Sequence, residues 1–235
     1  MRRVFEREGI EFGRGLSFFD AIFGFAITVL VVSIDPPPAK SWTSLSALLD
    51  SGLGNQLTCF AISFVVIAVF WRSNTQLLGR FRAMDSALII SNLVTVAFVV
   101  LLPFSTQGIS DPELYGMPLP TALYAVNVAL AILSQSVTAE IARARGLLID
   151  DVPRSAWWAA RIDVFAKIAV FLASVPVAFF FGSHWAQISW LSLIVIGQLT
   201  GRWSERVAQD ADPDPESPAA SDPGTAALPD NRPPE

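Results

Sequence analysis

Residues 16–34 read LSFFDAIFGFAITVLVVSI and are followed directly by Asp35 and three prolines. A helix needs about 20 predominantly apolar residues, rising 1.5 Å each, to cross a hydrocarbon core of about 30 Å. This stretch has that length, and its one charged residue, Asp20, lies near its start. Because prolines cannot continue a helix, the run predicts a membrane-spanning helix that ends before Asp35.

Five further apolar stretches of similar length follow along the chain. They cover residues 53–71, 83–104, 120–139, 164–182 and 186–203. Six spans of about 20 residues each leave little of the 235-residue chain for a soluble domain. The sequence therefore predicts an all-α, polytopic membrane protein. Its expected parts are an N-terminal segment (1–15), a domain of six transmembrane helices (16–203) and a disordered, acidic, proline-rich tail (204–235).

Composition excludes several other classes of protein. Hydrophobic residues make up 52% of the chain and charged residues 16%, whereas soluble domains carry about a quarter charged residues. The net charge of -5 and the lack of a basic stripe argue against a nucleic-acid partner. One cysteine and one histidine provide neither a disulfide framework nor a histidine metal site. With no enzyme motif in the sequence, we expect no catalytic residues, no metal and no cofactor.

The positive charges fix the expected orientation. Every Lys and Arg except Lys40 falls in the N-terminal segment, the tail, the connections after the second and fourth stretches, or, for Lys167 and Arg202, at the adjoining ends of the fifth and sixth stretches. By the positive-inside rule these parts are cytoplasmic, so both termini are expected inside the cell. The seven tryptophans lie at or near predicted helix ends, as interfacial indoles do. Residues 140–163 form the longest inner connection, and Trp157 and Trp158 within it predict a short interfacial helix.

Charged residues at the inner end of the first helix are candidates for function, since such residues are costly in a membrane. Arg14 and Asp20 are six residues apart, which places them 120° apart around a helix. They therefore cannot pair well within it, and each is expected to reach a neighbouring helix. The possible partners at inner helix ends are Asn74, Asp85, Arg161 and Asp163. A snorkelling arginine and an interfacial aspartate with a folding role only are the alternative.

The first helix also carries a stripe of residues on one face. Ala21, Phe25, Thr28 and Val32 recur at spacings of four, three and four. Around an axis of several copies, this stripe would form a narrow apolar tube with one ring of hydroxyls, and such a constriction can gate by dewetting. Packing against another helix of the same subunit is the alternative, and periodicity alone favours it.

Several short motifs resemble one known family. Arg14-Gly15-Leu16-Ser17-Phe18-Phe19-Asp20, followed by Phe23, Ala26, Ile27 and Thr28-Val29-Leu30, is similar to the first helix of the transmembrane protein 175 family, the endolysosomal and prokaryotic potassium channels. The similarity continues in these later segments: Ser63-Phe64 to Trp71, Asn92-Leu93, Leu102 to Thr106, and Leu123-Tyr124-Ala125 with Asn127. It covers roughly residues 12–203, and the length is similar to that of prokaryotic members.

The resemblance implies a homotetramer in which the first helix of each subunit lines the pore, without a P-loop filter. By position, Phe25 would form the hydrophobic constriction, and Thr28 would be associated with cation selectivity. Arg14, Phe18 and Asp20 match the motif residues that brace the pore helix. Three departures stand out: Phe19 replaces the motif serine, Phe25 replaces a smaller aliphatic residue, and Asn74-Thr75 stand where members often have two histidines.

These expectations combine into one functional hypothesis. The chain is predicted to be a leak-type, potassium-permeable cation channel in the cytoplasmic membrane of a prokaryote, with potassium ions and the lipid bilayer as partners. Two alternatives stay open: a non-conducting scaffold or accessory subunit whose acidic tail recruits a partner, and a proton-permeable channel. A secondary transporter is disfavoured, because no duplicated half is evident and no charge lies near the middle of a span.

Overall fold

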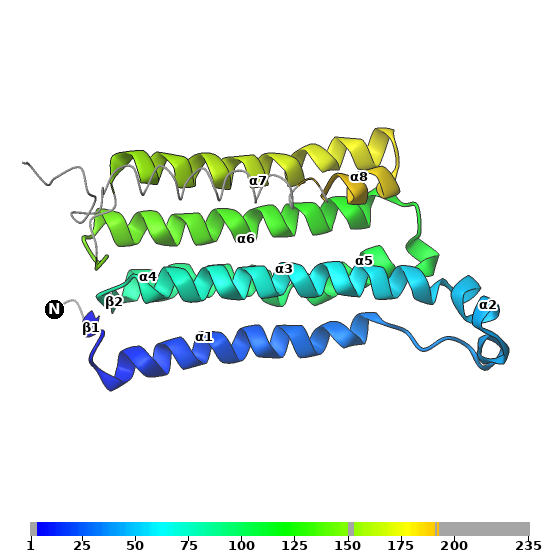
Figure 1. Cartoon of the computed structure of the whole chain (residues 1–235), viewed down its shortest axis with the longest axis horizontal. Coiled ribbons are helices and arrows are strands. Elements are labelled where there is room, and N and C mark those ends of the chain that lie inside the picture. Colours follow the sequence, from blue (N-terminus) through cyan, green and yellow to red (C-terminus); the bar gives the residue numbers. More distant parts are fainter. Residues whose placement is uncertain (1–3, 150–152, 191, 193–235) are drawn as a thin grey trace, which may run out of the picture.

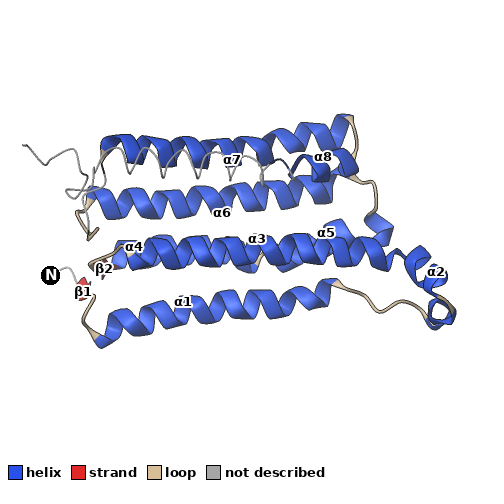
Figure 2. Cartoon of the chain, in the orientation of Figure 1, coloured by secondary structure: helices blue, strands red, loops and turns tan. Residues whose placement is uncertain are grey.

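The computed structural model describes residues 4–149, 153–190 and 192, and it is a bundle of long helices that run along one axis (Figures 1 and 2). The main helices are α1 (Ile10–Val29), α3 (Gly54–Gly79), α4 (Ser86–Val100), α5 (Leu102–Ser110), α6 (Pro118–Ala144), α7 (Arg154–Phe180) and α8 (Ser183–Trp190). Shorter elements are strands β1 (Val4–Glu6) and β2 (Ala83–Asp85), helix α2 (Leu45–Leu48), 3₁₀ turns at Leu30–Ser33, Ala39–Thr43 and Pro112–Leu114, and a π-helical turn at Leu49–Leu53.

Five of the predicted spans lie in the described part of the chain. The segments Ile10–Ser33, Leu45–Gly79, Ser86–Ser110, Pro118–Ala144 and Arg154–Phe180 are long and apolar enough to cross a membrane. The all-α membrane fold predicted from the sequence is therefore confirmed. The sixth predicted span, residues 186–203, lies mostly outside the described residues, as does the tail at 204–235.

The helices extend beyond the apolar runs that predicted them. α1 begins at Ile10 rather than near residue 16, and α3 continues about two turns past Trp71. The third span is divided after Val100, where Pro103, which lacks an N–H, stands in the first turn of α5. Apolar length marks the part of a helix that lies in hydrocarbon, whereas its polar end turns are held by hydrogen bonds and packing.

The prediction of a separate short interfacial helix within residues 140–163 is wrong. α6 continues to Ala144 and α7 begins at Arg154, so only the residues between them connect the two helices. Trp157 lies in the first turn of α7, where its Nε1 donates to Glu140 Oε1 of α6 at 3.2 Å and Arg143 stacks over its ring. These contacts between α6 and α7 extend both helices through the segment that looked interfacial in sequence.

A small sheet joins three segments at one end of the bundle, a feature with no counterpart in the sequence predictions. β1 pairs antiparallel with β2 in the connection between α3 and α4 (Figure 1). A bridge between Phe81 and Leu148 ties the same connection to the one between α6 and α7. Arg7 reinforces the junction, since its Nη1 donates to the carbonyls of Gly79 and Phe81.

The core lies along the inner faces of these helices. α6 packs against both α4 and α7, while α1 packs against α3 and α4. Fully buried side chains from four helices meet there, among them Phe23, Ile67, Leu88 and Tyr124. α6 is thus central in the subunit, and α1 lies at its margin.

Candidate functional site

One face of α1 is left uncovered by the described residues of the subunit. Along it, spaced four, three, four, three and four residues apart, lie Arg14, Phe18, Ala21, Phe25 and Thr28 of α1 and Val32 of the 3₁₀ turn that follows, and all six are exposed. Phe25 is 65% exposed and Val32 64%. The alternative that this stripe packs within its own subunit is therefore wrong for the described part of the chain.

The opposite face of α1 explains why the stripe is free. Phe12, Phe19, Phe23 and Ala26 are buried, and Leu30 continues the same face into the 3₁₀ turn. These residues pack toward α3, α4 and α5. Burying Phe12, Phe19 and Phe23 fixes the rotation of α1 about its axis, so the stripe points away from these helices.

The exposed stripe is mostly apolar, with one hydroxyl in its outer half. Thr28 Oγ1 donates to the carbonyl of Phe25 at 2.8 Å. That bond uses the only hydrogen of the hydroxyl, so its lone pairs are available as acceptors on the exposed face. Beside the stripe, a Cβ added to Gly24 would meet nothing within 4 Å. The face can thus offer oxygen to a cation at one level and an apolar surface elsewhere.

Asp20 is tied to a neighbouring helix. Its Oδ1 accepts a hydrogen bond of 2.9 Å from Trp71 Nε1 of α3. The bond links α1 to the helix on which it packs. Trp71 was noted in the sequence only as an interfacial residue and part of the family resemblance.

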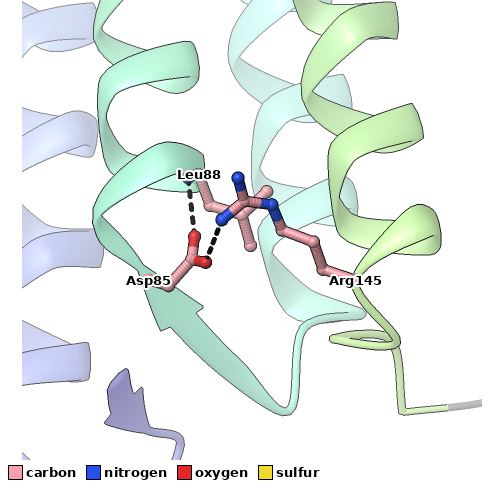
Figure 3. A network of polar contacts seen from close by, with 3 residues as sticks. All are labelled: Asp85, Leu88 and Arg145. Atoms are coloured by element: carbon pink, nitrogen blue, oxygen red, sulfur yellow. Dashed lines mark hydrogen bonds and ion pairs between the residues drawn. The ribbon is translucent and has the colours of Figure 1, made fainter. Parts of the chain in front are cut away.

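The predicted pairing of Arg14 and Asp20 with Asn74, Asp85, Arg161 or Asp163 needs correction. Asp85 caps α4 by accepting from the Leu88 N–H at 3.0 Å and forms an ion pair with Arg145 (Figure 3). The remaining three are held on other helices: Arg161 pairs with Glu140, Asp163 pairs with Lys167, and Asn74 is buried in α3. All four were chosen for their expected depth in the membrane, which can be estimated from the sequence. Pairing also depends on which helices are neighbours and on how each is rotated about its axis.

The two phenylalanines of the motif point in different directions. Phe18 is 54% exposed on the stripe, whereas Phe19 is buried in the core with its ring in edge contact with Phe18. Consecutive residues of a helix are 100° apart, so only one of the two can face the same side as Arg14. The described structure therefore places Phe19 in packing against its own subunit.

A buried hydroxyl cluster joins three helices and was not predicted. Ser63 Oγ of α3 lies 3.1 Å from Tyr124 Oη of α6 and accepts from Thr106 Oγ1 of α5 at 2.7 Å. Trp190 of α8 stacks on the Tyr124 ring at 4.9 Å and donates to Ser174 Oγ of α7. The only signal in the sequence was that Ser63, Thr106 and Tyr124 belonged to the motifs resembling the family.

A nearby amide supports the break between α4 and α5. Asn127 Nδ2 of α6 donates to the carbonyl of Phe98 at 3.1 Å, close to Pro103. Polar side chains inside the bundle thus stabilise contacts between helices, while the exposed face of α1 remains apolar.

Comparison with known proteins shows which family this chain resembles. Residues 14–103 match a family model described as endosomal/lysosomal potassium channel TMEM175. A potassium channel of Streptomyces collinus is 29% identical over 159 residues, which are 65% of this chain and 75% of that protein. A potassium channel of Chryseobacterium sp. is 22% identical over 53% of this chain, and the match spans 62% of the relative's length.

A solved structure has the same fold. The crystal structure of a lysosomal potassium-selective channel TMEM175 homolog from Chamaesiphon minutus superposes with a TM-score of 0.64, covering 81% of this chain and 98% of that one. The sequence identity is 20%, so this likeness concerns the fold. The matched family region, residues 14–103, contains the whole exposed stripe from Arg14 to Val32.

Proposed function

The chain belongs to the TMEM175 family, and we propose that it forms a potassium-permeable cation channel whose pore is lined by α1. The observation that carries this proposal is the free face of α1. Six residues are exposed there, whereas Phe12, Phe19, Phe23 and Ala26 on the opposite face of α1 are buried. Both similar bacterial proteins are potassium channels by name.

A homotetramer would turn the free face into a pore. Four copies of α1 around one axis would bring together four copies of Phe25 and, one turn further, four copies of Thr28. The Phe25 rings would form a hydrophobic constriction that closes by excluding water. The Thr28 hydroxyls would form a ring of acceptor oxygens, with Ala21 and Val32 lining the pore on either side.

The inner-end motif would hold this pore helix in place. Asp20 accepts from Trp71 of α3, so α1 cannot slide or turn without breaking a bond to its neighbour. Phe18 and Arg14 lie on the exposed face below it and would contact the adjacent copy. We expect the channel to be leak-type, without a P-loop filter, in the cytoplasmic membrane of a prokaryote.

The test is ion flux through the purified full-length protein in liposomes, with potassium and sodium compared side by side. Phe25→Ala removes the proposed constriction and should raise potassium flux severalfold. Phe165→Ala is the matched control, because Phe165 of α7 is 59% exposed but lies outside the stripe. An unchanged or smaller flux in Phe25→Ala, from protein assembled like the wild type, would argue against the constriction.

Two alternatives remain distinguishable in the same experiment. Proton flux without potassium flux would favour a proton-permeable channel. No flux of any cation from correctly assembled protein would favour the scaffold or accessory subunit, with the acidic tail as the docking segment. Deleting residues 204–235 separates these further, since a channel should conduct without its tail.

A further inference from the structure

A cluster of charged and aromatic side chains joins α6 to α7 at the end of the bundle that carries β1 and β2 (Figure 1). We call it the arginine–tryptophan cluster, and it consists of Glu140 and Arg143 of α6 and of Trp157, Trp158 and Arg161 of α7. The Arg143 guanidinium lies over the Trp157 ring, 4.6 Å from its centroid. The Arg161 guanidinium lies over the Trp158 ring at 5.1 Å. The exposed stripe belongs to α1, so the cluster is separate from the proposed pore.

The cluster has more hydrogen-bond donors than acceptors. Glu140 is its single carboxylate, and Glu140 Oε1 already accepts from Trp157 Nε1 at 3.2 Å and lies 3.4 Å from Arg161 Nε. Within the described part of the chain, the Arg143 guanidinium forms no ion pair and no hydrogen bond. A guanidinium carries five N–H donors along its edge, and stacking on a ring covers only its face. Most donors of the two arginines are therefore available to an anion.

The depth of the cluster in the membrane indicates where this anion comes from. Glu140 directly follows the apolar stretch 120–139, and Arg161 precedes the stretch 164–182 by three residues. Both side chains are partly exposed, and Trp158 is 59% exposed. The ends of apolar stretches lie at the headgroup level of a bilayer, where tryptophan is enriched. The free donors of the cluster therefore face phospholipid headgroups.

The surface beside the cluster is apolar and fits the rest of a lipid. Beyond Trp158, α7 exposes Ile162, Leu172 and Phe179, and all four side chains lie within about 100° of one another around the helix. Only 17% of the most apolar window of α7 is buried, the lowest share among the five described spans. A soluble phosphate gains nothing from such a face, whereas the acyl chains of a phospholipid can lie along it.

Charge selects anionic lipids over zwitterionic ones at this surface. Arg143 and Arg161 carry two positive charges against the one negative charge of Glu140, and Arg154, exposed one turn before Trp158, adds a third. Basic residues at the headgroup level attract anionic lipids, and a guanidinium can bind two phosphate oxygens at once. The same charges repel the choline of a zwitterionic lipid. Because the stacked rings and Glu140 hold the arginines in place beforehand, less side-chain entropy is lost on binding.

We propose that the arginine–tryptophan cluster binds the headgroup phosphate of one anionic phospholipid per chain, with the acyl chains along the apolar face of α7. The lipid would bridge α6 and α7 where both helices leave the hydrocarbon. This inference does not rest on the proposed channel function, because lipid binding is measured without ion flux.

The experiment measures lipid binding to the purified full-length protein by native mass spectrometry. The protein is released from micelles that contain phosphatidylglycerol and phosphatidylcholine with identical acyl chains, and the lipid concentrations are varied. We expect one phosphatidylglycerol per chain to bind saturably, about tenfold more tightly than phosphatidylcholine. Equal binding of the two lipids to the wild type would overturn the proposal.

Variants of the two arginines test the site directly. Each arginine near an anionic headgroup contributes about fivefold to affinity, so Arg143→Gln/Arg161→Gln should bind phosphatidylglycerol about 25-fold more weakly. Arg143→Gln alone keeps the contacts made by Glu140, so it separates lipid binding from helix packing, and it should lose about fivefold. Arg72→Gln/Arg80→Gln is the matched control, because it removes the same charge from two exposed arginines at the same end of the bundle. It should bind phosphatidylglycerol like the wild type.

Two results with these variants would overturn the proposal. One is unchanged phosphatidylglycerol binding in both cluster variants. The other is an equal loss in the matched control, which would indicate attraction to the general surface charge.

Further measurements distinguish the other anions and contacts that could occupy the cluster. Glycerol phosphate, a soluble headgroup analogue, should not displace the lipid at an equal concentration, and displacement would assign the cluster to a soluble anion. Asp150→Asn/Asp151→Asn removes the acids of the adjoining connection, which lie outside the described residues, and should bind the lipid at least as tightly as the wild type; weaker binding would contradict the proposal. A changed oligomeric state of Arg143→Gln/Arg161→Gln in lipid-free detergent would assign the cluster to a contact between copies and would also overturn it.

Discussion

Replacing Arg145 by methionine should destabilise the protein more than neutralising its partner Asp85. The two side chains form an ion pair (Figure 3), in which Asp85 is 1% exposed and Arg145 is 36% exposed. In Arg145→Met, the buried Asp85 carboxylate loses its ion pair with Arg145, at a cost of about 3 kcal/mol. In Asp85→Asn, the new amide still caps α4 at the Leu88 N–H, and Arg145 can be hydrated, so the cost is about 1 kcal/mol.

The difference between the two costs comes from burial. Both variants lose the same ion pair, so equal effects would be expected if the pair itself set the stability. In the double variant, no buried charge is left unpaired, and its cost should stay near that of Asp85→Asn. The resulting coupling energy is therefore about 3 kcal/mol in magnitude, at the upper end of the range for residues in contact.

The assay is unfolding in mixed detergent micelles, followed by circular dichroism at 222 nm and repeated for each protein. Arg80→Met is the matched control, because Arg80 is an exposed arginine at the same end of the bundle; its free energy of unfolding should change by less than about 0.5 kcal/mol. If Asp85→Asn costs as much as Arg145→Met, or if the double variant costs their sum, the argument from burial is refuted.

Two predictions concern the contacts between helices. Trp71→Phe removes the donor to Asp20 while keeping an aromatic ring, so we expect altered potassium flux in liposomes with an unfolding free energy changed by about 1 kcal/mol or less; wild-type flux would remove this bond from the gating hypothesis. Ser63→Ala takes the shared partner from Thr106 and Tyr124 and should cost about 1–2 kcal/mol in the micelle assay. Ser17→Ala, an exposed serine bonded only within α1, should cost close to nothing, and equal losses in both serine variants would contradict the cluster's role.

The sequence predicted the spans well because a bilayer imposes one strong requirement. A helix that crosses it must be apolar over about 20 residues, and this can be counted without knowing any neighbour. The same reasoning placed Ala21, Phe25, Thr28 and Val32 on one face of α1, since helical periodicity is local. Whether that face is covered is not local: periodicity alone favoured packing within the subunit, and the described residues do not cover the face.

Contacts between helices could not be read from the sequence for the same reason. Asp20, Trp71 and Asp85 all lie near inner helix ends, so depth in the membrane allowed several pairings among them. The rotation of each helix about its axis decides which pair forms, and large buried side chains such as Phe19 and Phe23 set that rotation for α1. The short pairing of β1 with β2 was missed because three residues carry too little pattern to signal a strand.

The share of buried residues differs from one span to another. In the most apolar windows of α6 and α7, 44% and 17% of residues are buried, and the value for the span that contains α1 is 22%. α6 also carries Tyr124, Asn127 and Ser134, which are bonded inside the subunit. A helix surrounded by protein can carry paired polar groups, whereas a helix that faces lipid must be apolar on its outer side. The exposed stripe of α1 combines low burial with one arginine and one hydroxyl, and Gly24 lies beside it. Under the proposed function, this surface contacts water and further copies of the chain instead of hydrocarbon.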